Sequence, residues 1–540
     1  MLRHEKCFHN VLCLSEAKGM DIIMREYIFG ANILENLTTG MYQDSKVIYR
    51  EYIQNACDQI DKAYNIGLLK PNEGRIDIWL DAEKRTVSIE DNATGIGAAD
   101  FERTLADIAN SDKKLGEDKG FRGIGRLCGL AYCKELIFTS TAAGEDVVSI
   151  MRCDALKMRE LINASENGKK YTASEVLRNI YVFDYEKTTE KDLHWFKVEM
   201  VGINNENTDL LDFAQIKEYL SFVAPVPYQN TFIFRTEVEK HARLIGYHID
   251  EYMIALNGEP IFKKYTTNFK TSKGEDEVFN IAFKEIYDSH NNLLAWLWIG
   301  VSRFKAVISR DCKMRGIRLR KENIQIGSED ALQKLFKEDR GHHYFIGEVF
   351  AVSKDLIPNS QRDYFNENAT RVEFEREMRR YFNNELSKIY YEGSAINSAY
   401  SKIDNYEKKQ AELQEKRAHG DFIDTSHLEN ALEEVKKAEE AAQKATDELE
   451  KKKQKAENNP DSVVSQVIKR IEEKRQQPVE KQKQIQNVQQ HSLEQRRVDR
   501  LSAYNKRERK LISKIFGIIV KSTDEKTAEM IIKKIEDELQ

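Results

Sequence analysis

Between residues 24 and 205, hydrophobic and polar positions follow the period of strands in some segments and the period of helices in others. Apolar side chains fill every second position on both sides of a charged turn near residue 83, which predicts a β-hairpin. Apolar residues at helical spacing predict helices in the same region. The predicted strands are 75–81, 86–90, 135–140 and 196–201, and the predicted helices are 47–63 and 101–110. The region therefore predicts one α+β domain.

The region from 206 to 395 has the same mixed character and predicts a second α/β domain. An amphipathic helix is expected at 213–222, and a continuous apolar run at 294–301 predicts a buried strand. Shorter strands are expected near 231–235 and 252–256. The last helix of this region is expected at about 371–391 and is predicted to end near Gly393, because glycine often follows a helix end.

After residue 404 the pattern becomes that of a coiled coil. Apolar residues fill the a and d positions of three heptads, and all the d positions are alanine, which permits close helix approach. These residues are Leu428, Ala431, Val435, Ala438, Ala442, Ala445 and Leu449. Residues 405–460 carry 14 acidic and 11 basic side chains, and 464–515 carry 14 basic and 6 acidic ones. These opposite charges favour an antiparallel helical hairpin over 404–500.

Apolar residues at helical spacing in 501–540 predict a closing pair of helices, and 1–23 form an unpatterned N-terminal extension.

A chain of 540 residues needs more than one core. Its seven cysteines form no CxxC pair, and it has neither a run of 18 apolar residues nor a secretory leader. A location in the reducing cytoplasm, with no membrane contact, is expected. The net charge of -6 gives no overall attraction to nucleic acid.

The predicted helix at 47–63 carries a polar stripe of Glu51, Asn55 and Asp58 on one face. The amide oxygen of Asn55 suits Mg²⁺, which prefers oxygen ligands and takes the rest from phosphates and water. One turn earlier, Glu51 could accept a proton from an attacking water. Taken alone, the stripe also fits a solvated face with an Asp58–Lys62 pair.

Asp91 ends a predicted strand and enters the turn Asp91-Asn92-Ala93-Thr94-Gly95-Ile96-Gly97. A carboxylate there can accept a hydrogen bond from the exocyclic amine of adenine. Gly95 and Gly97 let the backbone approach a base and sugar without a Cβ atom in the way. In isolation, the segment also fits an Asx-type hairpin turn.

A second glycine-spaced turn, Gly120-Phe121-Arg122-Gly123-Ile124-Gly125, precedes a predicted helix start. Free N–H groups at a helix N-terminus bind phosphates, so Gly120, Arg122, Gly123 and Gly125 are candidate nucleotide contacts. Alone, this spacing is weak evidence. The polar loop before it, with Lys113 and Lys114 as further candidates, suits a mobile lid or a plain exposed loop.

Together these residues resemble the gyrase, chaperone, histidine-kinase and MutL (GHKL) ATPases, and within them the ninety-kilodalton heat-shock chaperones. Residues 50–58 are similar to their magnesium-binding helix, 91–97 to their adenine turn, and 108–111 and 120–125 to the two ends of their lid. The resemblance implies a Bergerat-type α/β sandwich ATPase domain at 24–205, with ATP and Mg²⁺ as cofactors.

The resemblance continues into 206–395, which is similar to the transducer-like middle domain of these chaperones. The segments 345–349 and 355–362 carry it. In the family, an arginine of a comparable loop reaches the γ-phosphate, and Arg362 is the matching catalytic candidate. Arg362 also fits a surface arginine that caps the next helix.

The chain departs from the family pattern at three places. No threonine matches the one near the adenine aspartate, and 196–200 is where it would be sought. Ala98 follows the glycine turn where the chaperones often carry methionine. A coiled coil stands where they carry a C-terminal dimer domain, so client remodelling does not follow from the site alone.

Three functions remain open. The first is a slow ATPase that acts as a nucleotide-gated dimeric clamp or chaperone-like switch, with a protein partner on the coiled coil or C-terminal helices. By analogy of fold, it fits bacterial defence, including antiviral defence, or a stress response. The second is a DNA-associated clamp of the MutL, gyrase B or MORC type, motivated by the basic segment 464–515. The third is a coiled-coil scaffold that binds ATP without hydrolysing it.

Overall fold

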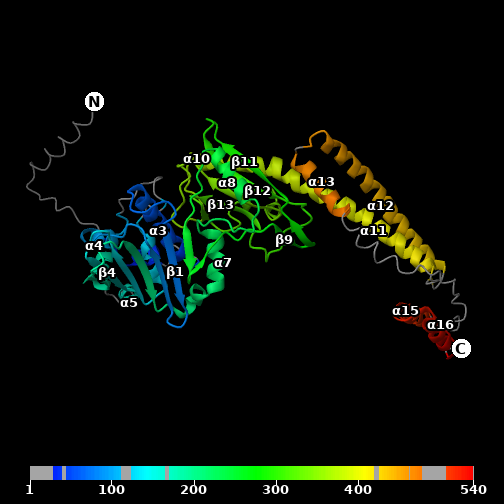
Figure 1. Ribbon diagram of the computed structural model, residues 1–540, viewed down its shortest axis with the longest axis horizontal. Coiled ribbons are helices and arrows are strands. Elements are labelled where there is room, and N and C mark those ends of the chain that lie inside the picture. The colour runs from blue at the N-terminus through cyan, green and yellow to red at the C-terminus, as the bar shows by residue number, and fades with distance from the viewer. Residues whose placement is uncertain are drawn as a thin grey trace, which may run out of the picture.

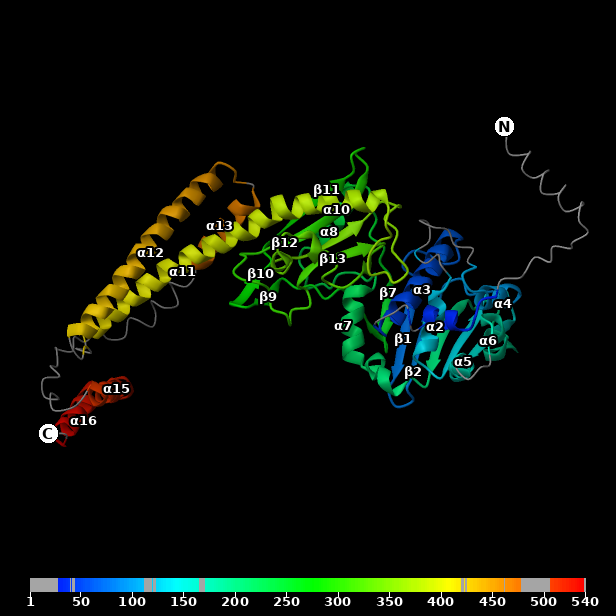
Figure 2. The same ribbon diagram turned by 180° about the vertical axis from the view of Figure 1, so that it is seen from behind.

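The computed structural model describes residues 28–38, 40, 44–110, 119, 123–164, 170–418, 422, 425–460, 462–476 and 506–538. Two sheets follow one another along the chain, and a long helical hairpin extends from the second (Figures 1 and 2). The mixed α+β class expected from the sequence is confirmed. The predicted extension 1–23 lies outside the described residues.

The first sheet has eight strands in the order β5-β4-β3-β6-β2-β1-β7-β8. Neighbouring strands are antiparallel except β1 and β7, which are parallel. The strands are β1 (Arg75–Asp81), β2 (Thr86–Asp91), β3 (Glu135–Thr141), β4 (Val147–Asp154), β5 (Tyr181–Lys187), β6 (Trp195–Val201), β7 (Met253–Leu256) and β8 (Glu259–Pro260). The predicted hairpin is present as β1 and β2, in the register Ile78 opposite Ile89.

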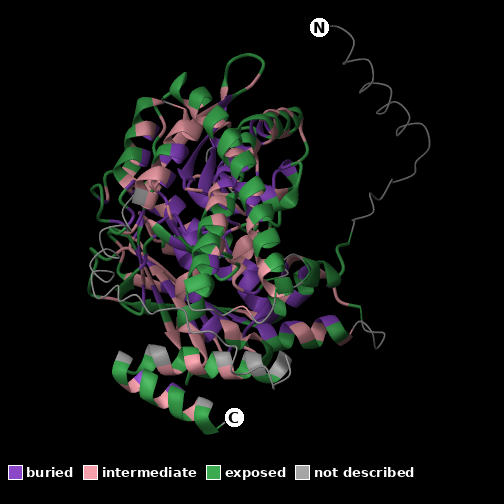
Figure 3. Cartoon of the chain, turned by 90° about the vertical axis from the view of Figure 1, so that its right-hand side faces the viewer, coloured by how far each residue is buried: buried purple, intermediate pink, exposed green. Residues whose placement is uncertain are grey.

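Helices cover one face of this sheet. Along β1, Ile76 and Ile78 are buried, whereas Trp79 on the opposite face is 53% exposed, as expected for a sheet with one solvated side. The covering elements are the helices α2 (Asn32–Thr38), α3 (Val47–Asn65), α4 (Ala98–Ala106), α5 (Ala155–Asn163) and α6 (Ala173–Ile180), and the 3-10 helix η1 (Gly125–Ala131). The core lies between the two layers. Figure 3 shows buried positions gathered in the interior of the molecule and exposed positions on its surface.

Helix α4 begins and ends earlier than the predicted 101–110. The Glu145 carboxylate accepts a hydrogen bond from the Ala98 N–H at 2.9 Å and so satisfies a free donor at the helix start. Asp107 adopts an extended conformation, which ends the helix. Because Glu145 is 47 residues away in sequence, local periodicity did not indicate this start.

The first sheet and its core extend beyond residue 205. After the 3-10 helix η3 (Asn205–Leu211), helix α7 (Phe213–Val223) packs on the same core, and β7 then pairs with β1. The predicted helix at 213–222 and strand at 252–256 are present. The strand expected near 231–235 is wrong, because these residues form a turn that leads into α8 (Arg235–Leu244) and buries Phe232 in an aromatic cluster.

The second sheet has five strands in the order β11-β12-β15-β13-β14. They are β11 (Asn280–Tyr287), β12 (Leu293–Val301), β13 (Gly316–Lys321), β14 (Ile324–Ile326) and β15 (Ile346–Ala351); a separate hairpin pairs β9 (Asn268–Thr271) with β10 (Gly274–Glu277). Every residue of β13, β14 and β15 is buried, because hydrophobic clusters cover both faces. The continuous apolar run of β12 predicted this burial.

A buried charged network crosses the second sheet. Arg320 and Lys263 both contact the Glu348 carboxylate, and all three side chains are fully buried. Burial would raise the pKa of Glu348, but the two cations hold it at about 2. Arg320 also donates to the Phe222 carbonyl at 2.8 Å, which ties the end of α7 to this sheet. The network therefore helps to fix the second sheet against the first.

The predicted helix end at Gly393 is wrong. Helix α10 (Ala369–Tyr381) passes through a π-helical turn (Phe382–Leu386) into α11 (Ser387–Ala418), a continuous helix of 32 residues. A Cβ atom at 393 would lie 3.0 Å from the Phe304 Cβ atom. Glycine is therefore present because the helix approaches the Phe304 loop closely.

The helical hairpin is formed by different arms from those expected. Helix α12 (Thr425–Glu457) packs along α11, and its buried residues include the heptad alanines Ala438, Ala442 and Ala445 (Figure 1). The predicted second arm begins as α13 (Val463–Gln476), which instead packs into the second core. Salt bridges from Arg470 to Glu277 and from Arg475 to Asp404 hold it there.

The predicted C-terminal helix pair is present as α15 (Lys506–Ser522) and α16 (Glu525–Glu538), which pack on each other. The short elements η4 (Gln333–Leu335) and α9 (Asp339–His342) lie between β14 and β15 in the chain. Within the described ranges, no helix has both the length and the apolar character that a membrane span requires.

Replacing Gly393 with valine is expected to destabilise the protein, although valine has the higher helix propensity. The two methyl groups would overlap the Phe304 ring, so the free energy of unfolding should fall by about 1–3 kcal/mol. Urea unfolding measures this change. Ser401→Val, at an exposed position of the same helix, is the control and should stay within about 0.5 kcal/mol of the parent. Equal stability of the two variants would contradict the packing argument.

Candidate functional site

A cavity of about 680 Å³ lies between α3, the turn after β2, the start of η1 and the loop that follows β15. It is lined by nine of the predicted site residues: Glu51, Asn55, Asp58, Asp91, Gly95, Gly97, Gly123, Gly125 and Arg362. The other four, Lys113, Lys114, Gly120 and Arg122, lie outside the described residues. The structure therefore brings together segments that are more than 300 residues apart.

One end of the cavity combines an apolar surface with a buried acid. The apolar side chains are Ile89, Phe138, Phe196 and Val198, from three neighbouring strands. Asp91 is 4% exposed, and its carboxylate accepts a hydrogen bond from the Ala93 N–H at 3.0 Å. Burial raises the pKa of Asp91 to about 7, and the nearby Glu90 adds to this rise. This end suits a flat apolar ring that carries a hydrogen-bond donor.

The glycines of the Asp91 turn allow it to pack closely against neighbouring residues. Gly95 has a φ of 63°, and a Cβ atom there would lie 1.9 Å from the Thr141 carbonyl oxygen. At Gly97, a Cβ atom would lie 2.8 Å from a Glu145 carboxylate oxygen. Close contact with the end of β3 and with Glu145 is therefore sufficient reason for glycine at both positions.

The polar end of the cavity is formed by α3 and the start of η1. Glu51 and Asn55 line it from successive turns of the helix. The Arg50 guanidinium lies 3.5 Å from a Glu51 carboxylate oxygen, which is longer than a charge-assisted hydrogen bond. A Cβ atom at Gly125 would lie 2.6 Å from the other carboxylate oxygen of Glu51, so glycine lets η1 begin against this acid. A carboxylate with accessible oxygen atoms can accept a proton here.

Asp58 has a different contact from the one expected. It is buried and accepts a hydrogen bond from the Lys119 N–H at 2.8 Å. The Lys119 ammonium group forms salt bridges with Asp61 and Asp250, and the Tyr252 hydroxyl donates to Asp61 at 2.7 Å. We call these five residues the Lys119 junction. Asp58 therefore anchors the end of the predicted lid on α3.

Sequence reasoning missed most of this junction. Asp61 lies one helical turn beyond Asp58, and Lys119 precedes the second glycine turn, so their positions could have drawn attention. Asp250 and Tyr252 belong to no motif. The chain fold alone places them beside α3.

Arg362 reaches the cavity from the second sheet. It lies in the loop between β15 and α10, has a φ of 53° and is only 6% exposed. Its guanidinium donates to the Lys119 carbonyl, and the Gly327 N–H donates to the Arg362 carbonyl at 2.8 Å. The surface-capping alternative is wrong, because Arg362 is buried and Asn368 caps α10.

The loop of Arg362 is also held on α3. The Arg50 guanidinium donates to the Gln361 carbonyl at 3.0 Å, and Ser360 lines the cavity with Arg362. Burial lowers the pKa of Arg362, although Glu51 opposes this effect. At physiological pH an arginine remains charged. The cavity therefore contains a positive group supplied by the second sheet.

The comparisons with known proteins identify the region around this cavity. Residues 44–181 match the family model described as histidine kinase-, DNA gyrase B- and HSP90-like ATPase. The chain is similar to Chaperone protein HtpG of Helicobacter hepaticus, with 32% identity over 132 residues, 21% of each chain. HtpG of Psychrobacter arcticus is 35% identical over 95 residues, 16% of this chain and 14% of the relative.

A longer and weaker similarity covers about half of the chain. HtpG of Citrobacter koseri is 21% identical over 282 residues, which cover 49% of this chain and 40% of the relative. The chain thus spans about a fifth of the length of the Helicobacter hepaticus relative and 40% of the Citrobacter koseri relative.

These matches cover only part of the chain, so they identify the family of that part alone. The cavity is lined chiefly by residues within 44–181, and the segments that carry the nucleotide motifs fall inside the matched range. Residues 44–181 form an ATPase domain of the histidine kinase, DNA gyrase B and HSP90 type, the GHKL superfamily.

Proposed function

We propose that the cavity binds ATP with Mg²⁺ and hydrolyses it slowly. One observation carries this proposal: the predicted residues of α3, the Asp91 turn, the second glycine turn and the Arg362 loop line a single cavity. Its volume of about 680 Å³ is ample for a nucleotide. The family of residues 44–181 and the similarity to HtpG chaperones support the same activity.

Adenine would occupy the apolar end of the cavity. The ring would lie against Phe138, Phe196 and Val198, and its exocyclic amine would donate to Asp91. A buried carboxylate selects a donor at that position, since an unmatched partner leaves it without the hydrogen bond. This contact favours adenine over guanine, which carries an oxygen there.

The triphosphate would extend toward Glu51, Asn55 and the start of η1. The donor set fits a magnesium ion, because Asn55 offers an amide oxygen and phosphates and water complete a hard oxygen shell. When bound, Mg²⁺ neutralises phosphate charge. Glu51 would accept the proton of the attacking water, and it lies on the same face of α3 as Asn55.

Arg362 and the Lys119 junction would make the site sensitive to the γ-phosphate. The Arg362 guanidinium lines the cavity and also bonds the Lys119 carbonyl at the end of the lid. A ligand that draws Arg362 toward its terminal phosphate changes this contact, so ATP and ADP would favour different lid positions. Hydrolysis would be slow because closure must come first.

We extend the proposal to a nucleotide-gated dimer that acts as a clamp or chaperone-like switch. The similarity to HtpG of Citrobacter koseri over 282 residues supports it. A protein partner would bind through the hairpin of α11 and α12 or through α15 and α16, where Leu511, Ile518 and Met530 are exposed. A cytoplasmic location and a role in defence or stress response stay predictions from the sequence.

The DNA-clamp alternative has less support. In residues 464–476, the first described stretch of the basic segment, Arg470, Lys474 and Arg475 pair with acidic residues of the same chain. The charges of these three side chains are therefore already compensated. The basic residues of 477–505 lie outside the described residues, and those of 506–515 belong to α15, so DNA binding by either group stays a prediction.

Adenosine binding is expected to depend on pH through Asp91. The pKa of Asp91 is about 7 in the free protein, and a hydrogen bond from adenine would lower it. The affinity for adenosine is then highest above this pKa. It falls as the pH drops through the pKa, by up to about tenfold per pH unit. Calorimetry with adenosine tests this, since adenosine has no titrating phosphate.

Asp91→Asn is the matched variant for this experiment. It should weaken ATP binding by about 10- to 100-fold and remove the pH dependence of adenosine binding. Normal ATP affinity in Asp91→Asn would refute the adenine contact.

Glu51→Ala is expected to retain ATP and to lower turnover by about 10²- to 10⁴-fold, the usual contribution of a general base. With ATP present it should accumulate as a closed dimer, which light scattering during size-exclusion chromatography detects. Glu102→Ala, at an exposed position of α4, is the control and should behave as the parent. Equal turnover of the parent and Glu51→Ala would favour the non-hydrolysing scaffold.

Arg362→Ala is expected to lower ATP turnover by about 10²- to 10³-fold, as loss of a charged transition-state contact does. ADP affinity should change little, because the contact is made to the γ-phosphate. Arg376→Ala, at a side chain 60% exposed, serves as the control. If ATP and ADP affinities fell equally and turnover at saturation were unchanged, Arg362 would have only a structural role.

A further inference from the structure

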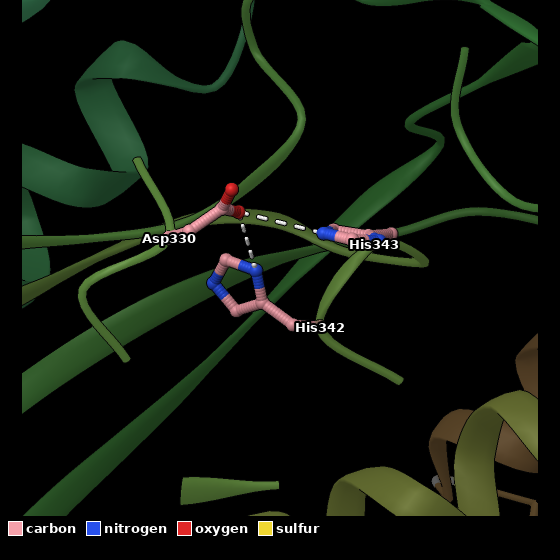
Figure 4. Close-up of side chains that lie close together, drawn as sticks. All are labelled: Asp330, His342 and His343. Carbon is pink, nitrogen blue, oxygen red and sulfur yellow. Dashed lines mark ion pairs between the residues drawn. The ribbon is translucent and has the colours of Figure 1, made fainter. Parts of the chain in front are cut away.

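Three side chains of the types that bind metals lie close together in the second domain, away from the nucleotide cavity. Asp330 follows β14, His342 ends α9, and His343 is the next residue (Figure 4). The Asp330 Oδ1 atom lies 3.5 Å from His342 Nδ1 and 3.4 Å from His343 Nε2. One donor atom from each residue lies within 4.8 Å of the other two.

The three facing atoms are buried and lack hydrogen bonds. Among the described residues, Asp330 Oδ1, His342 Nδ1 and His343 Nε2 have no hydrogen-bond partner. His342 is fully buried. The three facing atoms contact one another as His–Asp ion pairs (Figure 4), at distances longer than a charge-assisted hydrogen bond. Because buried polar atoms without hydrogen bonds are unfavourable, a common partner would stabilise all three.

We propose that Asp330, His342 and His343 bind a zinc ion. Zinc prefers tetrahedral nitrogen and oxygen ligands at about 2.0–2.2 Å, so two of its ligand atoms stand about 3.3–3.6 Å apart. The two measured separations, 3.5 and 3.4 Å, agree with this value. The side chain of His343 is 19% exposed, so water can complete the fourth position.

The Ile317 backbone faces the far side of the His342 ring. The Ile317 N–H donates to His342 Nε2 at 2.9 Å, and the Ile317 carbonyl oxygen lies 3.3 Å from the same atom. The first contact places the proton of the neutral ring on Nδ1, toward Asp330, so zinc on Nδ1 requires the other tautomer, in which Nε2–H donates to the Ile317 carbonyl. A Cβ atom at Gly316 would lie 2.5 Å from the His342 ring, so glycine makes room for it.

The charge balance around the cluster is mixed. Arg315 lies near His343. The same Arg315 repels a cation and reduces the affinity. The single carboxylate of Asp330 offsets this repulsion, and two imidazoles favour zinc over magnesium, which requires oxygen ligands.

A bound zinc would stabilise the segment that supports Arg362. Asp330 lies three residues after Gly327, whose N–H holds the Arg362 carbonyl at 2.8 Å. The ion would join this segment to the end of α9. The zinc site does not depend on the proposed ATPase activity, since it rests on the three side chains alone.

Metal content of the full chain tests the proposal. The protein is stripped with a chelator, dialysed against Zn²⁺ and analysed by mass spectrometry for zinc per chain. Asp330→Asn and His343→Ala should each bind one zinc fewer than the parent. His290→Ala, an exposed histidine, is the control and should bind as many as the parent.

Cobalt provides a second measurement. Co²⁺ in a tetrahedral site absorbs visible light more strongly than octahedral Co²⁺, and the parent should show this band, whereas Asp330→Asn and His343→Ala should not. Circular dichroism confirms that the variants remain folded. Equal zinc content in the parent and both folded variants, with an unchanged cobalt spectrum, would overturn the proposal.

Discussion

The arrangement of the cavity depends on the Lys119 junction. The Lys119 ammonium group is buried between Asp61 of α3 and Asp250, which precedes β7. Burial alone would lower the pKa of Lys119, but the two carboxylates raise it above its usual range. The Lys119 side chain is 8% exposed, whereas Asp61 is 38% and Asp250 28% exposed, so water screens both ion pairs. The buried ammonium group is therefore paired only while the end of the lid, α3 and the segment before β7 stay together.

The backbone of Lys119 links this junction to the second domain. The Lys119 N–H is held by Asp58, and its carbonyl accepts from Arg362. A single residue at the end of the lid thus contacts the polar stripe of α3 through its N–H and the arginine loop through its carbonyl. At the proposed ATP site, a change at the terminal phosphate would reach the second domain through these hydrogen bonds, without rearrangement of either hydrophobic core.

The second sheet supplies the rigid support that this coupling needs. Its central strands are buried on both faces, and the Glu348 network ties them to the end of α7. The loop of Arg362 leaves the last of these strands and is supported by Gly327. The proposed zinc ligands stand just beyond Gly327, so the same segment would be stabilised from both sides.

Elements whose patterns are local could be predicted from the sequence. The stripe of α3, the hairpin of β1 and β2 and the apolar run of β12 each contain their own signal, because periodicity records which face is buried. The motif residues Glu51, Asn55, Asp91 and Arg362 were also recognisable, and they line one cavity. Their spacing in the chain, with the family resemblance, determined the candidate site.

Only the tertiary structure decided the features that depend on distant partners. Glu145 sets the start of α4, Phe304 explains Gly393, and α11 takes the place of the expected partner of α12. The contacts of Lys119 with Asp250, and of Asp330 with His342, leave no local pattern for the same reason. A hydrogen bond or a packing contact depends on where two side chains meet in space, and a one-dimensional pattern records only how each segment faces its own surroundings.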